Sequence, residues 1–419
     1  MATHHALQSS LFDSPALPPP ATLRCCAPAE DIDLAAPDLR GARIEKELWT
    51  ARQRQGNALH EISYRACFKA QLPHYFITRL TQPYERVYDP FSGRGTTVVE
   101  AALLGRRIIA NDINPLSEIL ARPRIAPPRL AEIVARLDAI DLNRRAPADE
   151  HDPDLSAFYH PETEQALRAL RAYLFERRAS GAEDDVDRWI RMVATNRLTG
   201  HSPGFFSVYT LPPNQATLPE RQHAINAARG QLPPPRDVKR IILKKSAQLL
   251  SQLSEELRAK MAELAQDALF LTSRAQATPQ IASDSVSLTV TSPPFLDIVQ
   301  YAEDNWLRCW FNHIDADAVA ASMSVSAQLA VWREEMRAAL AELYRVTRPG
   351  GHVAFEVGEV RNGRIMLDEV IAPLGIEAGF QVKAILINKQ TFTKTSNIWG
   401  VRNNRKGTNT NRIVLFVKE

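Results

Sequence analysis

Short apolar runs alternate with amphipathic runs along much of the chain, and this alternation predicts an α/β protein. The apolar run at residues 86–88 is followed by an amphipathic run at 96–104, which favours a helix, and by a second apolar run at 107–110. Strands joined by helices pair in parallel in a doubly wound sheet, whereas the last two runs predict an antiparallel closing pair. The seven predicted strands are 86–88, 107–110, 268–271, 286–290, 352–357, 380–388 and 412–418.

The segment between the second and third predicted strands does not follow this alternation. Leu167, Leu170 and Leu174 fall at helical spacing. We therefore predict a Rossmann-like, seven-stranded mixed sheet with a helical insertion. The predicted helices of the insertion are 130–140, 161–178, 184–198 and 238–265.

Composition divides the chain into a tail and three further parts. Residues 1–38 are rich in Ala, Pro and Ser without periodicity and predict a disordered tail. Helical structure is expected from Arg40 around Glu47 and again at 73–80. The predicted parts are 39–129 for the first half of the sheet domain, 130–267 for the insertion and 268–419 for the second half.

Charge and cysteine content narrow the class of protein. The 419 residues carry a formal net charge of +3, so contacts with nucleic acid must come from local basic patches. The four cysteines lack the spacing of a zinc site or a disulfide framework. No apolar run reaches the length of a membrane span, and no signal-peptide core is present. We expect a cytoplasmic protein without a metal ion.

A turn after the first predicted strand reads D-P-F-S-G-R-G-T-T from Asp89. Gly93 and Gly95 let the backbone approach a ligand and adopt positive φ. Asp112 follows the second strand, where an acid accepts hydrogen bonds from ribose hydroxyls. The Asp89 carboxylate would repel a pyrophosphate and suits a cofactor with an amino or cationic group. The turn predicts a nucleoside-like cofactor site; the alternative is an ordinary glycine turn.

A second turn, T-S-P-P-F from Thr291, follows the predicted strand at 286–290. Each proline removes an N–H, so the turn offers the Ser292 hydroxyl and backbone carbonyls but few donors. These acceptors suit the exocyclic amine of a base, whose lone pair they would aim at a methyl donor. Phe295 offers a face for stacking, and a base must leave its duplex to reach such a pocket. Alone, Ser-Pro-Pro is an ordinary turn; its place after a strand favours the chemical interpretation.

The two turns together resemble those of the S-adenosylmethionine-dependent amino-methyltransferases of DNA. The resemblance covers residues 58–120 and 269–419, and it implies the class I methyltransferase fold. In that family an F-x-G-x-G turn binds S-adenosylmethionine, and [S/D/N]-P-P-[Y/F] is the catalytic turn. T-S-P-P-F looks like the cytosine-N4 branch, since adenine-N6 members usually show Asp-Pro-Pro-Tyr. The cofactor turn precedes the catalytic turn here, the reverse of the commonest cytosine-N4 order.

The resemblance also implies a role for particular residues. The segment from His60 to Pro73 is similar to an H-P-Y-P-A-K-F-x-P segment of some members, without its Pro-Tyr-Pro part, and it would bring Lys69 to the methionine carboxylate. The residues expected to bind the cofactor are Lys69, Asp89, Phe91, Gly93, Gly95 and Asp112. The residues expected to hold the base are Ser292, Pro293, Pro294 and Phe295.

Two basic segments are candidates for contact with DNA. One follows the aromatic stretch at 200–215, and the other lies between the last two predicted strands, at 390–411. Lys and Arg there would contact phosphates, and Asn and Gln would contact base edges. The alternatives are a solvated helix face for the first segment and a mobile surface loop for the second. The residues predicted to bind nucleic acid are Arg236, Lys239, Arg240, Lys394, Arg402 and Arg405.

These patterns predict a site-specific DNA methyltransferase. The expected reaction transfers methyl from S-adenosylmethionine to the N4 amine of cytosine in double-stranded DNA, directly and without a metal. A cognate restriction endonuclease is the expected partner. The alternatives are an adenine-N6 DNA methyltransferase, an RNA amino-methyltransferase and a cofactor-binding DNA regulator without turnover.

Overall fold

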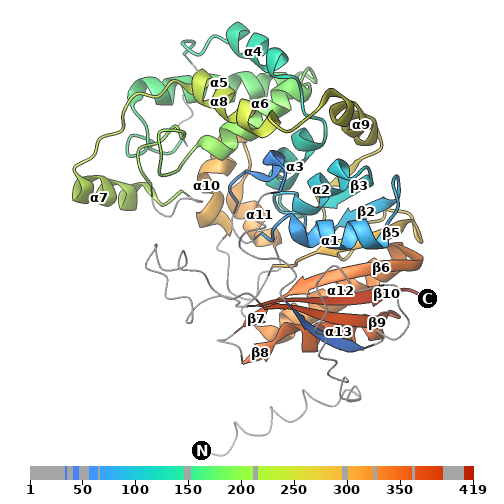
Figure 1. Ribbon diagram of the computed structural model, residues 1–419. Helices are drawn as coiled ribbons and strands as arrows, with labels where there is room; N and C mark the ends of the chain where they lie inside the picture. Colours follow the sequence, from blue (N-terminus) through green and yellow to red (C-terminus); the bar gives the residue numbers. More distant parts are fainter. Residues whose placement is uncertain are drawn as a thin grey trace, which may run out of the picture.

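The computed structural model describes residues 34, 41–46, 56–64, 67–145, 152–210, 216–294, 301–323, 328–360, 364–389 and 410–419. At its centre lies an eight-stranded sheet with the strand order β1-β9-β10-β6-β5-β2-β3-β4 (Figure 1). The strands of this sheet are β1 (Ala42–Lys46), β2 (Arg86–Asp89), β3 (Arg107–Asn111), β4 (Leu269–Leu271), β5 (Val286–Thr291), β6 (Thr347–Val357), β9 (Gln381–Lys389) and β10 (Thr410–Val417). A separate two-stranded ribbon pairs β7 (Glu359–Val360) with β8 (Ile365–Met366).

Seven of these strands are the predicted ones, and the predicted mixed α/β sheet is confirmed. Strands β2 to β6 pair in parallel. Strand β10 runs antiparallel to both β6 and β9, as expected for the closing pair. The carboxyl ends of β2 to β6 therefore open at one rim of the sheet.

The eighth strand, β1, corrects the prediction of helical structure from Arg40. It pairs in parallel with β9, with Ala42 opposite Ala384. Ala42 and Ile44 are buried and the residues after them are more exposed, a period of two that favours a strand on a half-buried edge. The signal spans five residues, too few for a periodicity count to separate strand from helix. Glu47 lies outside the described residues.

Helices cover both faces of the sheet, and alternating side chains of the strands feed two separate cores. Val87 packs into the core under α1, α2 and α3, while its neighbour Tyr88 packs into the core under α12 and α13. The helices that flank the sheet are α1 (Gln71–Leu80), α2 (Thr96–Leu103), α3 (Leu116–Ile125), α9 (Glu255–Gln266), α12 (Leu329–Val346) and α13 (Leu367–Glu377).

Along the chain, helices α4 to α8 come between β3 and β4. They gather at one end of the molecule, at the top of Figure 1. They are α4 (Leu130–Ala139), α5 (Pro161–Ala179), α6 (Asp185–Arg197), α7 (Pro219–Arg229) and α8 (Val238–Leu250). Helix α7 was not predicted. The single helix predicted at 238–265 is two helices, because the chain leaves α8 at Ser251 and the Ser254 side chain caps α9 by accepting from Leu257 N. Helix α9 packs against α2, α3 and β3 rather than against the insertion.

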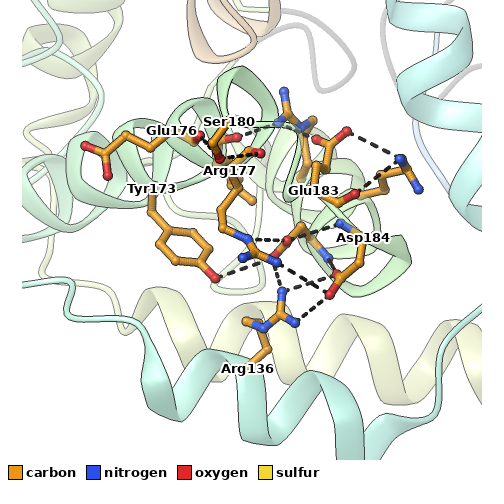
Figure 2. Close-up of polar contacts among 11 residues, drawn as sticks. Arg136, Tyr173, Glu176, Arg177, Ser180, Glu183 and Asp184 are labelled. Atoms are coloured by element: carbon orange, nitrogen blue, oxygen red, sulfur yellow. Dashed lines mark hydrogen bonds and ion pairs between the residues drawn. The ribbon is translucent and has the colours of Figure 1, made fainter.

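A buried carboxylate joins three helices of the insertion (Figure 2). Asp187 on α6 is fully buried and pairs with Arg136 of α4 and with Arg177 of α5, whose Nε lies 2.8 Å from Oδ2. Asp184 caps α6 by accepting from Asp187 N at 3.0 Å and pairs with Arg136 at 2.6 Å. The insertion is therefore held by paired charges as well as by its apolar core.

Helices α10 (Tyr301–Phe311) and α11 (Ala316–Ser322) follow β5 and lie between the insertion and the sheet (Figure 1). Trp310 Nε1 donates to Asp152 at 2.6 Å, and the Trp310 carbonyl accepts from Arg171 Nε at 2.8 Å. Asn312, just past α10, donates to Thr195 Oγ1 of α6 at 2.9 Å. The segment that continues from β5 is thus docked on the insertion. None of the described helices is long and apolar enough to cross a membrane.

Candidate active site

The turn between β2 and α2 is built around two glycines in the left-handed region. Gly95 precedes α2 with φ +79°, and a Cβ at this position would lie 2.5 Å from the Cβ of Ala121. Gly93 has φ +51° and faces the ring of Tyr64, which a Cβ would meet at an ordinary 3.7 Å. Gly95 is therefore required by packing and backbone together, while Gly93 leaves the turn open beside an aromatic ring.

Asp112 lies at the carboxyl end of β3, at the position predicted to hold a ribose. Its Oδ2 accepts from Gly93 N at 2.7 Å, and its Oδ1 accepts from Asn114 N at 2.9 Å. Burial raises the pKa of Asp112 to about 6, although both hydrogen bonds lower it. Each carboxylate oxygen keeps a further lone pair for a hydroxyl. The structure thus brings Asp112 directly against the glycine turn, and its contact with a ribose stays a prediction.

The side chain of Asn111 fastens three strand ends beside this turn. Its Nδ2 donates to the carbonyls of Pro90 after β2 and Ser273 after β4, at 3.2 and 3.0 Å. Its Oδ1 accepts from the Ser273 hydroxyl at 2.8 Å. Every hydrogen-bonding group of this buried amide is satisfied, so the rim at β2, β3 and β4 is rigid.

A hydrogen bond joins the two predicted turns. Thr291 Oγ1, at the end of β5, donates to Asp89 Oδ1 at 2.6 Å, although the residues are 202 positions apart. Thr97 Oγ1 of α2 donates to the Val290 carbonyl at 2.9 Å. The glycine turn and the Ser-Pro-Pro turn therefore meet at the same rim of the sheet.

The Asp89 carboxylate is buried, with 1% exposed. Burial raises its pKa to about 7, and hydrogen bonds from Thr291, Thr97 and Phe91 N oppose this increase. Asp89 was predicted to face the cofactor, and the structure places it as the joint between the two turns. A direct contact with a cofactor stays a prediction. Phe91 packs against the core on the α12 side.

Ser292 lies next to a buried acid that the sequence did not reveal as a site residue. The pairing of Thr291 with Phe355 in neighbouring strands sets Glu356 beside Ser292. Glu356 accepts hydrogen bonds from the Ser292 side chain and from Asn411 Nδ2, the latter at 2.7 Å. Burial raises the pKa of Glu356 to about 7 against both hydrogen bonds. The sequence feature that could have indicated Glu356 as a site residue was its position, as an acid among the apolar residues of a predicted strand.

The two prolines of the catalytic turn differ in what their carbonyls do. The Pro294 carbonyl accepts from Trp332 Nε1 of α12 at 2.9 Å, which fixes the turn against the sheet. The Pro293 carbonyl accepts no hydrogen bond within the described part of the chain. Within the described residues, Ser292 Oγ and the Pro293 carbonyl can therefore still accept hydrogen bonds from a ligand. Phe295 lies outside the described residues.

The segment upstream of β2 packs against the cofactor turn, as the resemblance implied. Arg94, between the two glycines, donates from Nη1 to the Ile62 carbonyl at 2.9 Å. Tyr64 OH accepts from Asn114 Nδ2 at 3.1 Å, and burial followed by the Asp112 charge raises the tyrosine pKa. Tyr64 is a further lining residue that the sequence did not single out. Lys69 lies just before α1 in the same segment.

Glu100 on α2 fastens this upstream segment by two histidines. Its carboxylate accepts from His60 Nε2 and from His74 Nδ1, each at 2.7 Å. Burial raises the pKa of Glu100, but the two histidine hydrogen bonds outweigh it and lower the pKa to about 2. The segment upstream of β2 is therefore anchored to α2, the helix that follows Gly95.

The predicted nucleic-acid contacts are only in part within the described chain. Arg236, Lys239 and Arg240 lie at the start of α8 in the insertion, where Asp237 caps the helix and the Arg236 backbone bonds to Thr163 at 2.8 Å. They are not part of the cofactor rim. Lys394, Arg402 and Arg405 lie outside the described residues. Among the residues that are described, no group of three or more His, Cys, Asp or Glu side chains could hold a metal ion.

Comparison with known proteins agrees with the first half of this site. Residues 37–120 match the family model described as DNA methylase, of the N6 and N4 amino-methyltransferases. The chain is also similar to the type II methyltransferase M.MvaI of Kocuria varians, with 35% identity over 81 residues. Residues 37–120, which include the glycine turn, are therefore similar to the DNA amino-methyltransferases. These matches do not separate the cytosine-N4 branch from the adenine-N6 branch.

The matched part is a small share of each protein. The alignment with M.MvaI covers 18% of this chain and 18% of that relative. A putative DNA modification methylase from Thermus thermophilus is 23% identical, over 33% of this chain and 46% of that chain, with a TM-score of 0.19. A methyltransferase from Methanosarcina mazei is 10% identical, over 82% and 96%, with a TM-score of 0.31. Superpositions this loose carry no functional comparison.

Proposed function

We propose that this protein transfers a methyl group from S-adenosylmethionine to the exocyclic amine of a DNA base. The hydrogen bond between Thr291 and Asp89 is the observation that carries this proposal. It brings a glycine turn suited to a nucleoside and a turn made of hydrogen-bond acceptors to one rim of the sheet. The family match over residues 37–120 supports the choice of DNA as the substrate.

The cofactor turn offers what a nucleoside with an amino-acid tail needs. Asp112 keeps lone pairs for ribose hydroxyls, and Gly93 presents open backbone beside the Tyr64 ring. The carboxylate of the tail would meet Lys69, which lies in the adjoining segment. When bound, S-adenosylmethionine supplies an electrophilic methyl group on a positively charged sulfur.

The catalytic turn holds the substrate amine by two acceptors. Because the Ser292 hydroxyl donates its only hydrogen to Glu356, its oxygen lone pairs are directed away from that carboxylate and remain free to accept from the amine. The Pro293 carbonyl is the second acceptor. Holding both amine hydrogens favours a tetrahedral nitrogen with its lone pair aimed at the methyl group. The buried Glu356 charge also stabilises the positive charge that develops on this nitrogen in the transition state.

Cytosine N4 is the base atom that we propose as the acceptor. Serine at position 292, where adenine-N6 enzymes usually carry aspartate, supports this choice. Adenine N6 is the second candidate, because the Glu356 carboxylate, which is hydrogen-bonded to Ser292, adjoins the same turn. The DNA would be double-stranded, with recognition by the insertion, and a cognate restriction endonuclease would be the partner of a site-specific enzyme.

The test is to incubate the protein with DNA and S-adenosylmethionine labelled in the methyl group, and then to digest the DNA to nucleosides. Label in N4-methylcytosine is the expected result. Label only in N6-methyladenine would refute the base assignment, and transfer to RNA alone would refute the DNA substrate. Ser292→Ala removes one of the two proposed acceptors. This variant should bind the cofactor with unchanged affinity and lose methyl transfer.

A further inference from the structure

Three cations from three helices converge between the insertion and the cofactor turn. Arg197 ends α6, Lys245 lies on α8 and Arg308 lies on α10. Arg308 Nη2 donates to the Ser63 carbonyl at 3.2 Å. Asn196, which accepts from Arg197 Nη2 at 2.8 Å, also accepts from Ser63 N at 3.2 Å. We call Arg197, Lys245 and Arg308 the cationic cluster.

The cationic cluster adjoins the proposed active site on two sides. Ser63 precedes Tyr64, whose ring faces Gly93 in the cofactor turn and lies 5.7 Å from the Arg308 guanidinium. Arg308 also belongs to α10, the first helix after the catalytic turn, which lies between the insertion and the sheet (Figure 1). The three cations are therefore placed where a nucleic-acid strand would pass between the insertion and the two turns.

Two cations of this cluster, Arg197 and Lys245, are held mainly by neutral groups in the described part of the chain. Arg197 bonds to the side chain and carbonyl of Asn196, and Lys245 Nζ donates to Gln248 at 3.1 Å. Among the described residues, the Glu61 carboxylate lies 4.0 Å from Lys245 Nζ and is 53% exposed, whereas the Lys245 side chain is only 8% exposed. Within the described part of the chain, no carboxylate lies within 4.0 Å of the Arg197 guanidinium.

Arginines elsewhere on α6 show the opposite arrangement. Arg188 pairs with Asp185 at 2.9 Å, and Arg191 pairs with Glu183 at 2.5 Å. One helix thus carries paired arginines along its length and an arginine without a carboxylate at the end that faces the cofactor turn. Arg197 instead lies 4.0 Å from the centroid of the Phe205 ring, a cation–π contact that leaves its charge open to an anion.

Burial of like charges carries a cost that a bound anion would remove. Burial and the charge of the neighbouring Arg197 lower the pKa of Lys245 to about 8. Burial and the charge of Arg308 lower the pKa of Arg197 to about 10. A charge taken out of water is stabilised when an opposite charge with hydrogen-bond acceptors enters the same site. An anion would therefore stabilise Arg197 and Lys245, whose charges the described part of the chain leaves largely uncompensated.

We propose that the cationic cluster binds a backbone phosphate of the DNA strand that carries the target base. This inference rests on the proposed function and adds a contact that fixes the strand beside the extruded nucleotide. A phosphate suits the cluster because guanidinium groups bind its oxygens in a bidentate manner and an ammonium adds a point charge. The contact is separate from the predicted basic residues at the start of α8.

The experiment measures binding of a short mixed-sequence DNA duplex by fluorescence anisotropy at several salt concentrations. Arg197→Gln and Lys245→Gln each remove one cation of the cluster. Lys244→Gln is the matched control, since Lys244 is the exposed neighbour on the same helix. We expect the slope of log affinity against log salt to become shallower by about 1 in each cluster variant and to stay unchanged in the control. Arg197→Lys should restore the slope.

The outcomes separate this inference from the proposed function. Cluster variants that keep the wild-type slope while retaining cofactor affinity and thermal stability would overturn the phosphate contact alone. An equal change in Lys244→Gln would also overturn it, because binding would then follow overall charge. Preferential binding of an RNA duplex through the cluster would overturn the choice of DNA. A wild-type protein that binds neither cofactor nor duplex would refute the proposed function itself.

Discussion

Replacing Glu356 by glutamine tests how the Ser292 hydroxyl is oriented. Glutamine keeps the size of the side chain and an oxygen that accepts from Asn411, a contact of 2.7 Å in the native protein. The other half of the carboxylate becomes an amide that donates to Ser292 Oγ. Ser292 must then turn its own hydrogen towards the substrate amine, where a donor meets a donor. The variant therefore reverses one hydrogen bond and leaves the fold unchanged.

The expected magnitude follows from the charge on the acceptor. A hydrogen bond to a charged group contributes about 1.5–3 kcal/mol, which corresponds to roughly a 10- to 150-fold loss of kcat. The affinity for S-adenosylmethionine should not change, because Glu356 lies on β6 beside the catalytic turn and away from the glycine turn. Single-turnover transfer of labelled methyl to DNA measures the loss, and calorimetry measures cofactor binding. Glu359→Gln, three residues further along the chain, is the matched control.

The pH profile provides the second readout. Burial raises the pKa of Glu356 to about 7, so the carboxylate that accepts from Ser292 forms only as the pH rises through this value. The wild-type rate should increase through pH 7, and Glu356→Gln should lose the part of this increase that belongs to Glu356. Asp89 has a raised pKa of about 7 as well, so the difference between wild type and variant is the quantity to compare. A variant with wild-type kcat and an unchanged profile would refute the orienting role of Glu356.

Three further predictions concern stability. Gly95→Ala should lower the free energy of unfolding by roughly 2–4 kcal/mol, because it combines a left-handed backbone with overpacking. The control Gly230→Ala, at φ +57° with nothing within 4 Å of the added Cβ, should lower it by only about 1–2 kcal/mol, and urea titration measures both. Asp187→Asn should lower the free energy of unfolding by about 3–5 kcal/mol, because it leaves two arginines without their buried charged partner. The control Glu176→Gln, at an exposed ion pair, should change the unfolding midpoint little, and equal losses in the two variants would contradict the role of burial. Since the pKa of Asp89 is about 7 in the folded protein and about 4 in the unfolded chain, the folded state binds more protons in this window and stability falls as the pH rises from about 4 to 7. Asp89→Asn, which keeps an oxygen for Thr291, should flatten that part of the stability profile, and an unaltered profile would show that Asp89 is ionised throughout.

The features that could be predicted from the sequence are those that depend only on neighbouring residues in the chain. The glycine turn after a strand and the Ser-Pro-Pro turn after another each state their geometry locally, because Gly permits positive φ and Pro restricts it. Asp112 was found in the same way, as an acid directly after a strand. Their meeting point followed from a general property of parallel sheets, whose strands end at one rim.

The features that could not be predicted depend on how distant segments pair. Glu356 reaches Ser292 only through the register of β5 and β6, in which Thr291 lies opposite Phe355. A slip of one residue would turn its side chain to the other face of the sheet. Asp89 was expected to be open to a ligand, and its burial depends on Thr291, 202 positions away. The cationic cluster draws one residue from each of three helices, so no stretch of sequence displays it.

The insertion is coupled to the chemistry through α10 more than through the sheet. The segment after the catalytic turn enters α10, whose end is held by Arg171 of α5 and by Thr195 of α6 through Asn312. The same helix carries Arg308, which bonds to Ser63 beside the cofactor turn. One helix therefore contacts the insertion and the upstream wall of the site, and it continues the catalytic turn. Under the proposed function, α10 would therefore link DNA bound by the insertion to the amine held at Ser292.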